Sequence, residues 1–417
     1  MPAQTANRQS ALVRIALLVC TLSGLLPIAV QPAEAGLAAP AEIARGRYLA
    51  TLGDCAACHT APGGSSKPYA GGYPLHAYFG TVYSSNITPD DKTGIGSWSK
   101  DAFYRAMHDG IGADGRHLYP AFPYVYFTKL PRADVDALYA FLRTVKPVRH
   151  TPPPNRLIFP ANIRAGLALW NALFLDTSPL KSDPSRSPQW NRGAALVNGI
   201  GHCGGCHTPK TFLFNDEQNR YLQGETIDGW FAPNLTSSQR TGLGAWSAGD
   251  IALYLKTGGN RFGRAVGAMQ DVIRVSTSKM SDGDRAAVAT YLKSLPPAPE
   301  KASTKPDVIT MQLGEAAFVQ RCSVCHGTDT RSYPSLAHNS VATLPDPATL
   351  VRVILQGSQS VPAPEKPMGF SMPAFPVLSN KDLAAVATYV RNAWGNSAGP
   401  VSEKQVETIR KRLRPAG

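Results

Sequence analysis

Apolar residues recur at helical spacing in three segments of the chain. Residues 134–142, 284–292 and 382–390 read DVDALYAFL, DRAAVATYL and DLAAVATYV. The first stripe, at i, i+3, i+4 and i+7, is formed by Val135, Leu138, Tyr139 and Leu142, and the third repeats it with Leu383, Val386, Ala387 and Val390. Strand signals are few elsewhere. The pattern therefore predicts an all-α fold in which these helices are packing elements.

Capping residues mark where the three helices begin. Ser281 and Ser379 are each followed three residues later by Asp, as is typical of N-caps. Pro131 suits the first turn of the remaining copy.

The repetition extends beyond these helices. Short amphipathic helices are expected from GRYLATLGD (46–54), GAALVNGIGH (193–202) and GEAAFVQR (314–321). NITPDDKTGIGSW (86–98) returns as NLTSSQRTGLGAW (234–246), 148 residues later. Proline-rich segments separate the copies at 151–155, 178–188 and 295–306. We predict three consecutive domains, at 36–150, 185–298 and 310–395, with linkers at 151–184 (carrying a short apolar helix) and 299–309 and a basic tail at 396–417.

The first 35 residues predict export. Arg8 and Arg14 precede an apolar run from 15 to 30, and Ala33-Glu34-Ala35 offers a cleavage site, so the mature chain is expected to start near Gly36. The alternative is an uncleaved anchor helix. No later apolar stretch is long enough to span a bilayer.

The net charge of +13 favours acidic partners or an anionic membrane surface. Nucleic acid is not expected as a partner, because no binding motif accompanies the charge. Residues 165–175 (AGLALWNALFL) are expected to form either a buried helix or a surface helix that docks on a membrane or partner. Val406, Ile409 and Leu413 share one face of the tail, which suits an anionic surface or a solvated helix end.

All cysteines beyond residue 35 lie in three CxxCH motifs, which are CAACH (55–59), CGGCH (203–207) and CSVCH (322–326). This is the signature of c-type haem attachment. On a helix, residues i and i+3 face the same way, so both thiols can add to one porphyrin while the histidine reaches the iron. A zinc half-site would need further ligands, and a redox dithiol needs no histidine. We predict three covalent haems c, anchored by Cys55, Cys58, Cys203, Cys206, Cys322 and Cys325, with His59, His207 and His326 as proximal ligands.

Several longer segments carry a family resemblance: WNRGAALVNGIGHCGGCHTPK (190–210), GWFAPNLTSSQRTGLGAW (229–246), DGRHLYPAFPY (114–124) and MPAFPVLSNKDLAAVATYVRN (372–392). Through them the chain resembles the tri-haem cytochrome c subunits of bacterial membrane-bound dehydrogenases, which serve alcohol, gluconate, fructose or sorbitol dehydrogenases. The resemblance implies a peripheral electron carrier on the periplasmic face of the cell membrane. It also implies a large flavin-, PQQ- or molybdenum-dependent catalytic subunit as partner, and ubiquinone or a terminal oxidase as acceptor.

Methionine commonly fills the second axial position of an electron-transfer haem. Met269 lies in a Gly-Ala-Met loop before a closing helix, and Met372 matches the MPAF motif of the family. We expect haem 2 to be ligated by His207 and Met269, and haem 3 by His326 and Met372. Met280, Met311 and Met368 are weaker candidates.

The loop for haem 1, LYPAFPY (118–124), contains no methionine. Relatives with YPAMPY place Phe122 at the ligand position, whereas alignment of PAFP (120–123) with PAFP (373–376) places Tyr119 there. Met107 maps to the middle of a helix. The histidines between the first motif and this loop, His76, His108 and His117, are further candidates. The sixth ligand of haem 1 therefore stays open.

The sequence contains no flavin or quinone fingerprint, catalytic triad or paired acid–base motif, so we predict no catalytic residue in this chain. The expected function is electron transfer for a dehydrogenase. One alternative is a peroxidase-like or small-molecule redox enzyme acting at an open haem 1. Another is a haem-bearing structural or assembly protein.

Overall fold

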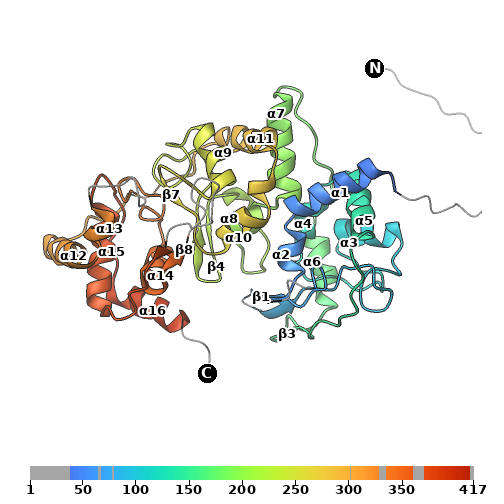
Figure 1. The fold of residues 1–417 in the computed structure, drawn as a ribbon, viewed down its shortest axis with the longest axis horizontal. Coiled ribbons are helices and arrows are strands. Elements are labelled where there is room, and N and C mark those ends of the chain that lie inside the picture. The colour runs from blue at the N-terminus through green and yellow to red at the C-terminus, as the bar shows by residue number, and fades with distance from the viewer. Residues whose placement is uncertain are drawn as a thin grey trace, which may run out of the picture. The chain divides into compact units, whose positions relative to one another are not determined.

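A pair of crossing helices holds each of the three repeats together (Figure 1). The computed structural model describes residues 38–63, 67–77, 79–300, 302–327, 335–359 and 371–413. The expected signal peptide and Met368 lie outside these ranges. The pairs are α1 (Pro40–Leu52) with α5 (Arg132–Leu142), α7 (Pro188–Ala195) with α11 (Asp282–Lys293), and α12 (Val308–Arg321) with α15 (Asn380–Asn392).

A glycine allows each pair to approach closely. A Cβ added to Gly193 would come within 2.0 Å of the carbonyl oxygen of Ala287. The equivalent distances are 1.8 Å from Gly46 to Ala137 and 2.2 Å from Gly314 to Ala385. Any side chain at these positions would push the helices apart, so the same crossing is built three times from the same residue type.

The second helix of each pair begins as the sequence predicts. The Ser281 side chain accepts a hydrogen bond from the backbone N–H of Asp284, and Ser379 accepts one from Asp382. Pro131 directly precedes α5. The two predicted serine N-caps are confirmed.

Smaller helices fill the space between the pairs. In repeat 1 they are α2 (Cys55–Cys58), α3 (Lys100–Asp109) and α4 (Tyr124–Phe127); α6 (Gly166–Phe174) follows in the linker. In repeat 2 they are η1 (Leu196–Ile200), α8 (Gly204–His207), η2 (Gln218–Arg220), α9 (Ala248–Thr257), α10 (Ala268–Val275) and η3 (Thr277–Lys279). In repeat 3 they are α13 (Ser323–His326), α14 (Ala348–Gln356) and α16 (Glu403–Leu413).

The fold is mostly helical but not all-α as predicted. Short antiparallel strands pair β1 (Pro74–Ala77) with β2 (Gly80–Tyr83), β4 (Glu225–Ile227) with β5 (Trp230–Ala232), β6 (Gly259–Asn260) with β7 (Gly263–Arg264) and β8 (Ser358–Gln359) with β9 (Ser371–Met372). β3 (Arg156–Leu157) adds to β2. Strands of two to four residues are too short to show the alternation by which a strand is recognised in a sequence.

Repeats 1 and 2 share one hydrophobic core. It joins Leu49, Phe103 and Leu138 to Val197, Ile200 and Leu292, among others. The contact is reciprocal, because α4 of repeat 1 packs on η1 of repeat 2 while α10 of repeat 2 packs on α2 of repeat 1. The Tyr48 hydroxyl also donates a hydrogen bond of 2.8 Å to Asp284 across this boundary.

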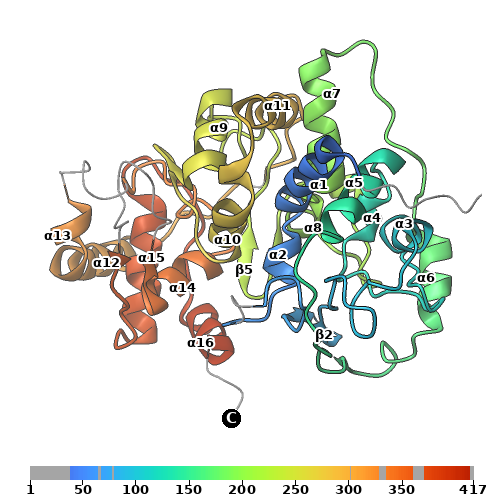
Figure 2. The same cartoon turned by 45° about the vertical axis from the view of Figure 1, so that its right-hand side comes forward.

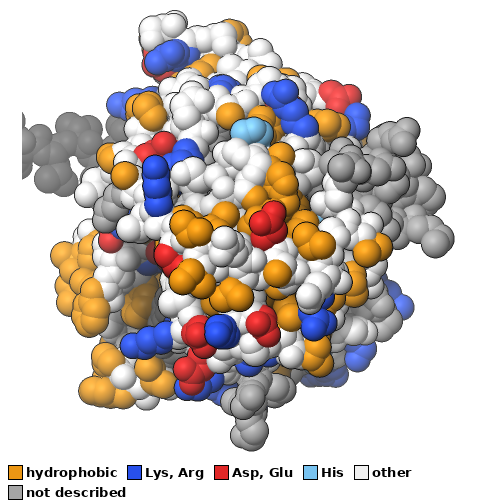
Figure 3. Space-filling view, turned by 90° about the vertical axis from the view of Figure 1, so that its left-hand side faces the viewer, with side chains coloured by type: hydrophobic (Ala, Val, Ile, Leu, Met, Phe, Trp, Pro, Cys, Tyr) orange, Lys and Arg blue, Asp and Glu red, His pale blue; other side chains and the backbone are white. Residues whose placement is uncertain are grey.

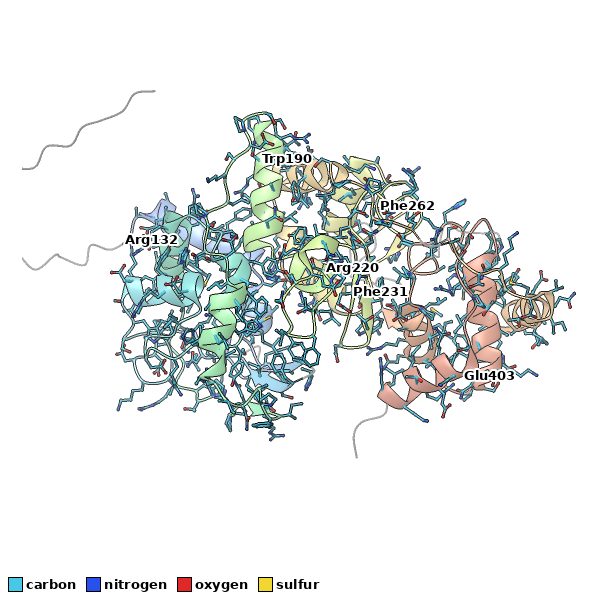
Figure 4. The ribbon with its side chains drawn as sticks, turned by 180° about the vertical axis from the view of Figure 1, so that it is seen from behind. Arg132, Trp190, Arg220, Phe231, Phe262 and Glu403 are labelled. Atoms are coloured by element: carbon cyan, nitrogen blue, oxygen red, sulfur yellow. The ribbon has the colours of Figure 1, made fainter. Side chains whose placement is uncertain are left out.

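Repeat 3 has its own core and contacts repeat 2 through α14, which lies against β5 (Figure 2). The backbone N–H of Phe231 donates to the Thr349 hydroxyl at 2.9 Å, and the N–H of Ser340 donates to the carbonyl of Phe262 at 2.7 Å. Figure 4 labels Phe231 and Phe262 on the side of repeat 2 that is turned towards repeat 3.

The C-terminal helix α16 is part of that core. Val406 and Ile409 are buried against repeat 3, and Leu413 packs beside them. The apolar face that suggested either a surface-binding or a solvated helix is therefore used for internal packing. Within the described residues, no helix combines the length and apolar character needed to cross a bilayer.

Candidate haem sites

Each CxxCH motif lies on a short helix directly after the first helix of its repeat. None of the six cysteines is joined to another in a disulfide. The residue that precedes the first cysteine turns the chain in a left-handed conformation in repeats 1 and 2, with φ of 53° at Asp54 and 35° at His202. The motif helices α2 and α8 are thereby set at an angle to α1 and η1.

The predicted proximal histidines of repeats 1 and 2 are oriented in the same way. The Nδ1 atom of His59 lies 2.7 Å from the carbonyl oxygen of Ser85, and Nδ1 of His207 lies 2.7 Å from that of Pro233. A carbonyl can only accept, so Nδ1 carries the proton and Nε2 is left as the ligating atom. Burial lowers the pKa of both imidazoles, which favours the neutral form that binds iron.

These residues fit a c-type haem. Two thiols one helical turn apart and an imidazole with its Nε2 unprotonated are the groups that attachment requires. Burial raises the pKa of the Cys55 and Cys203 thiols to about 12. Bound haem would supply a one-electron iron couple.

In repeat 3 the motif ends α13, where His326 follows Cys325. The segment that comes next, 328–334, lies outside the described residues. The assignment of His326 stays a prediction.

The predicted methionine ligands occupy different local structures. Met269 lies in the first turn of α10, after Gly267 with φ of 60°, and Met372 ends the strand β9, paired with Ser358. Met280 is buried in the shared core, as expected of a packing residue. Ligation by Met269 and Met372 remains a prediction.

The loop for haem 1 uses its aromatic residues for packing. The Tyr119 hydroxyl donates to the carbonyl of Ala161 at 2.9 Å, and the Arg164 guanidinium lies 4.7 Å from the Tyr119 ring centroid. The Phe122 ring packs edge-on against Phe127, with centroids 5.5 Å apart. Tyr119 is therefore directed towards the linker, and Phe122 is left as the loop residue that packs on the shared core.

The other candidates for this haem have partners of their own. Met107 is buried on α3. Nδ1 of His108 lies 2.6 Å from the Asp109 carboxylate, and Nδ1 of His117 lies 3.2 Å from the Asn171 amide nitrogen. His76 contacts Thr81 across the β1–β2 pair.

The first two motifs adjoin one another, which the sequence did not indicate. Nε2 of His202 lies 3.4 Å from the carbonyl oxygen of Gly53. A Cβ on Gly53 would be 2.8 Å from Cδ1 of Ile200. Tyr126 of repeat 1 packs over Gly204 in the second motif, and its hydroxyl donates to the Asp216 carboxylate. The left-handed residue before each of these two motifs could not be predicted from the sequence, because one copy has Asp54 and the other His202 at this position.

Asp54 lies in this contact with its carboxyl buried. Its Oδ1 atom has no hydrogen-bond partner among the described residues. Burial, and next the negative charge of Asp271, raise the pKa of Asp54 to about 7.

Comparison with known proteins also indicates a c-type cytochrome. A family model described as "Cytochrome c" matches residues 43–146 and 311–394. The chain is 39% identical to the cytochrome c subunit of a quinone-dependent alcohol dehydrogenase from Gluconobacter oxydans, with 94% of this chain and 87% of that protein aligned. It is 38% identical to the gluconate 2-dehydrogenase cytochrome c subunit of Pantoea cypripedii (88% and 89% aligned). It is 36% identical to the fructose dehydrogenase cytochrome subunit of Gluconobacter japonicus (88% and 82% aligned). These similarities extend over most of the chain, which also carries the CxxCH motifs of haem attachment. The chain therefore belongs to the family of cytochrome c subunits of alcohol, gluconate and fructose dehydrogenases.

Proposed function

We propose that this chain is a three-domain, tri-haem cytochrome c that transfers electrons for a membrane-associated dehydrogenase. The three equivalent helix crossings at Gly46, Gly193 and Gly314 support three cytochrome c-like domains. The proposed haems are held at Cys55–His59, Cys203–His207 and Cys322–His326. Substrate oxidation is assigned to a separate catalytic subunit.

The observation that carries this proposal is the contact between the first two motifs. His202 and Gly53 connect them, and Cys55 of the first motif and Cys203 of the second pack against one hydrophobic core. Two redox sites set side by side in an apolar core suit electron exchange between them. Substrate chemistry would need catalytic polar groups directed into an open site, and neither the Tyr119 hydroxyl nor Phe122 supplies one.

The third motif is proposed as the end that meets the catalytic subunit. Val324, inside CSVCH, is 89% exposed, whereas Gly205 at the equivalent position of CGGCH is only partly exposed. Exposed Val308, Ile309 and Val319 on α12 add to an apolar surface on repeat 3 (Figure 3). An exposed apolar surface beside a redox site is suited to docking of another protein.

Export and peripheral membrane attachment complete the proposal. Leu169 and Leu173 on α6 are exposed, as are Ile158 and Phe159 in the linker. The Trp170 indole N–H donates to the carbonyl of Leu213 at 2.8 Å, which joins α6 to the exposed Phe212 in repeat 2. This apolar surface suits insertion into the headgroup region of a bilayer. Ubiquinone or a terminal oxidase is the proposed acceptor, in keeping with the family resemblance.

The proposal is tested by purifying the tagged chain from solubilised membranes of a producing strain. We expect a large dehydrogenase subunit to co-purify, and the haem bands to be reduced when its substrate is added. Ethanol, gluconate and fructose are the first substrates to try. The chain without that subunit should be reduced by none of them. Peroxide turnover by the isolated chain would instead favour a haem enzyme.

A further inference from the structure

Arg352 of repeat 3 is a partly buried cation at the boundary with repeat 2. Its guanidinium lies 4.2 Å from the centroid of the Trp230 ring. Nη1 donates a hydrogen bond to the carbonyl of Asp228, and a Cβ on Gly229 would be 2.6 Å from that nitrogen. The guanidinium of Arg352 therefore lies directly against the turn of the β4–β5 hairpin at Gly229, whose φ of 71° favours glycine.

One donor of the Arg352 guanidinium has no acceptor among the described residues. This donor, the Nε–H, is buried. Burial lowers the pKa of Arg352, and the charge of Asp228 opposes this only in part. A buried guanidinium normally has a hydrogen-bonded anionic partner, and a buried N–H without an acceptor is costly.

Two other arginines of the described residues have hydrogen-bond partners. Arg391, which is fully buried, donates to the carbonyls of Gly399, Ala342 and Leu344. Arg261, which lies 4.7 Å from the Phe262 ring centroid, is exposed and pairs with Asp250 at 3.0 Å. The Nε–H of Arg352 is thus a buried donor without an acceptor among the described residues, and a carboxylate is the acceptor that a guanidinium fits best.

Trp230 connects Arg352 to both ligand-bearing segments of the haem 2 site. The hairpin that carries Trp230 runs directly into Pro233, whose carbonyl holds Nδ1 of His207. On the other side, a Cβ on Gly267 would be 2.5 Å from Cδ2 of Trp230, and Gly267 lies two residues before Met269. The segment that orients His207 and the segment that carries Met269 both contact the Trp230 indole. Arg352, which lies over this indole, is therefore at the edge of the predicted haem 2 site.

We propose that Arg352 binds a propionate carboxylate of the haem attached to Cys203 and Cys206, so that repeat 3 supplies a charge to the haem site of repeat 2. The propionates are the anions at the periphery of a haem, and the thioether bonds occupy another part of it. Arg352 acts here as a positioning residue that also favours the reduced state electrostatically. The inference rests on haem attachment at the second motif, which forms part of the proposed function.

The test is a redox titration of the full holoprotein carrying Arg352→Gln. Loss of the cation leaves the propionate charge uncompensated and favours ferric iron. We expect the equilibrium constant for reduction of one haem to fall about tenfold, a shift of about 59 mV for a one-electron couple. The propionate should also titrate on reduction, so the potential of that haem should become pH-dependent between about pH 5 and 8, where the parent is flat.

Two controls separate charge from packing. Arg261→Gln removes an exposed arginine that also lies over an aromatic ring, and should leave all three potentials unchanged. Thr349→Val removes the acceptor for Phe231 N–H and so perturbs the same boundary without changing charge. It should not introduce the pH dependence. Met269→His, which substitutes nitrogen for sulfur, identifies the haem 2 transition by lowering its potential.

The proposal is overturned if Arg352→Gln behaves like Arg261→Gln, if Thr349→Val reproduces its effect, or if the shifted transition belongs to another haem. Failure of the underlying function is distinguishable from these outcomes. In that case mass spectrometry would find no haem on the peptide that contains Cys203 and Cys206.

Discussion

Gly193 lies so close to Ala287 that a Cβ on the glycine would come within 2.0 Å of the alanine carbonyl oxygen. The same relationship recurs between Gly46 and Ala137 and between Gly314 and Ala385. Three copies of one backbone contact show that each repeat is assembled around the same helix crossing, with its haem motif following directly after the first helix.

We therefore predict that Gly193→Ala lowers the free energy of unfolding by about 3 kcal/mol, because α7 and α11 must separate. Gly283→Ala is the matched control on α11, since its nearest neighbour lies 3.9 Å away. It should leave stability unchanged or raise it by up to about 1 kcal/mol. Denaturant unfolding of the holoprotein measures both. Equal effects of the two changes would contradict the crossing as a stability determinant.

The repeats and their helices could be predicted from the sequence because their signals are local. The stripe from Val135 to Leu142, the N-cap Ser281 and the CxxCH spacing each lie within a few residues. The contact of His202 with Gly53 and the stacking of Arg352 on Trp230 join residues more than 100 positions apart. Contacts between residues so far apart cannot be predicted from local sequence periodicity, because they form only when the repeats pack together.

For the C-terminal helix α16, the sequence predicted the apolar face but not its contact. The stripe of Val406, Ile409 and Leu413 was predicted correctly as one helical face, but the sequence did not show what that face contacts. Amphipathic periodicity indicates that one side of a helix is covered. The same pattern is expected whether a lipid surface or a neighbouring helix covers that side. The structure places the face against repeat 3.

Haem 1 is expected to differ from haems 2 and 3 in its axial ligation. Tyr119 is bonded to Ala161, and the loop offers no methionine. The ferric protein should therefore show the methionine–iron charge-transfer band for two haems. Met269→Leu and Met372→Leu should each remove one of these signals, and Phe122→Ala should remove neither. Three methionine signals in the parent would refute this expectation, and loss of one in Met107→Leu would identify the source.

Asp54 should make stability depend on pH. Burial raises its pKa to about 7 in the folded state, so the folded protein prefers the protonated carboxyl. The contribution is fully present below the unfolded pKa near 4 and is lost as the pH rises to about 7. Relative to Asp54→Asn, the parent should lose up to about 4 kcal/mol across this range.

The measurement for Asp54 is the denaturant midpoint of parent and variant between pH 4 and 8. Asp271→Asn is the informative control, because it removes a negative charge that helps to raise the pKa of Asp54. It should reduce the pH-dependent loss. Parallel pH profiles for parent and Asp54→Asn would show that the carboxyl does not titrate as its burial implies.

Membrane attachment should depend on the exposed face of α6. The double change Leu169→Glu and Leu173→Glu places charges where the proposed surface meets the bilayer, and should release most of the protein from vesicles that contain anionic lipid. Val377→Glu changes an equally exposed apolar residue on repeat 3 and should not. Sedimentation with the vesicles measures binding. Undiminished binding of the double variant would assign attachment to another part of the chain or to the partner.

The central claim, three covalent haems in one electron-transfer chain, is tested most directly by the intact mass of the protein purified from a periplasm that carries out cytochrome c maturation. The account predicts three haem additions to a chain that starts near Gly36, and two after Cys322→Ser and Cys325→Ser are combined. Two or fewer additions to the parent chain would contradict it.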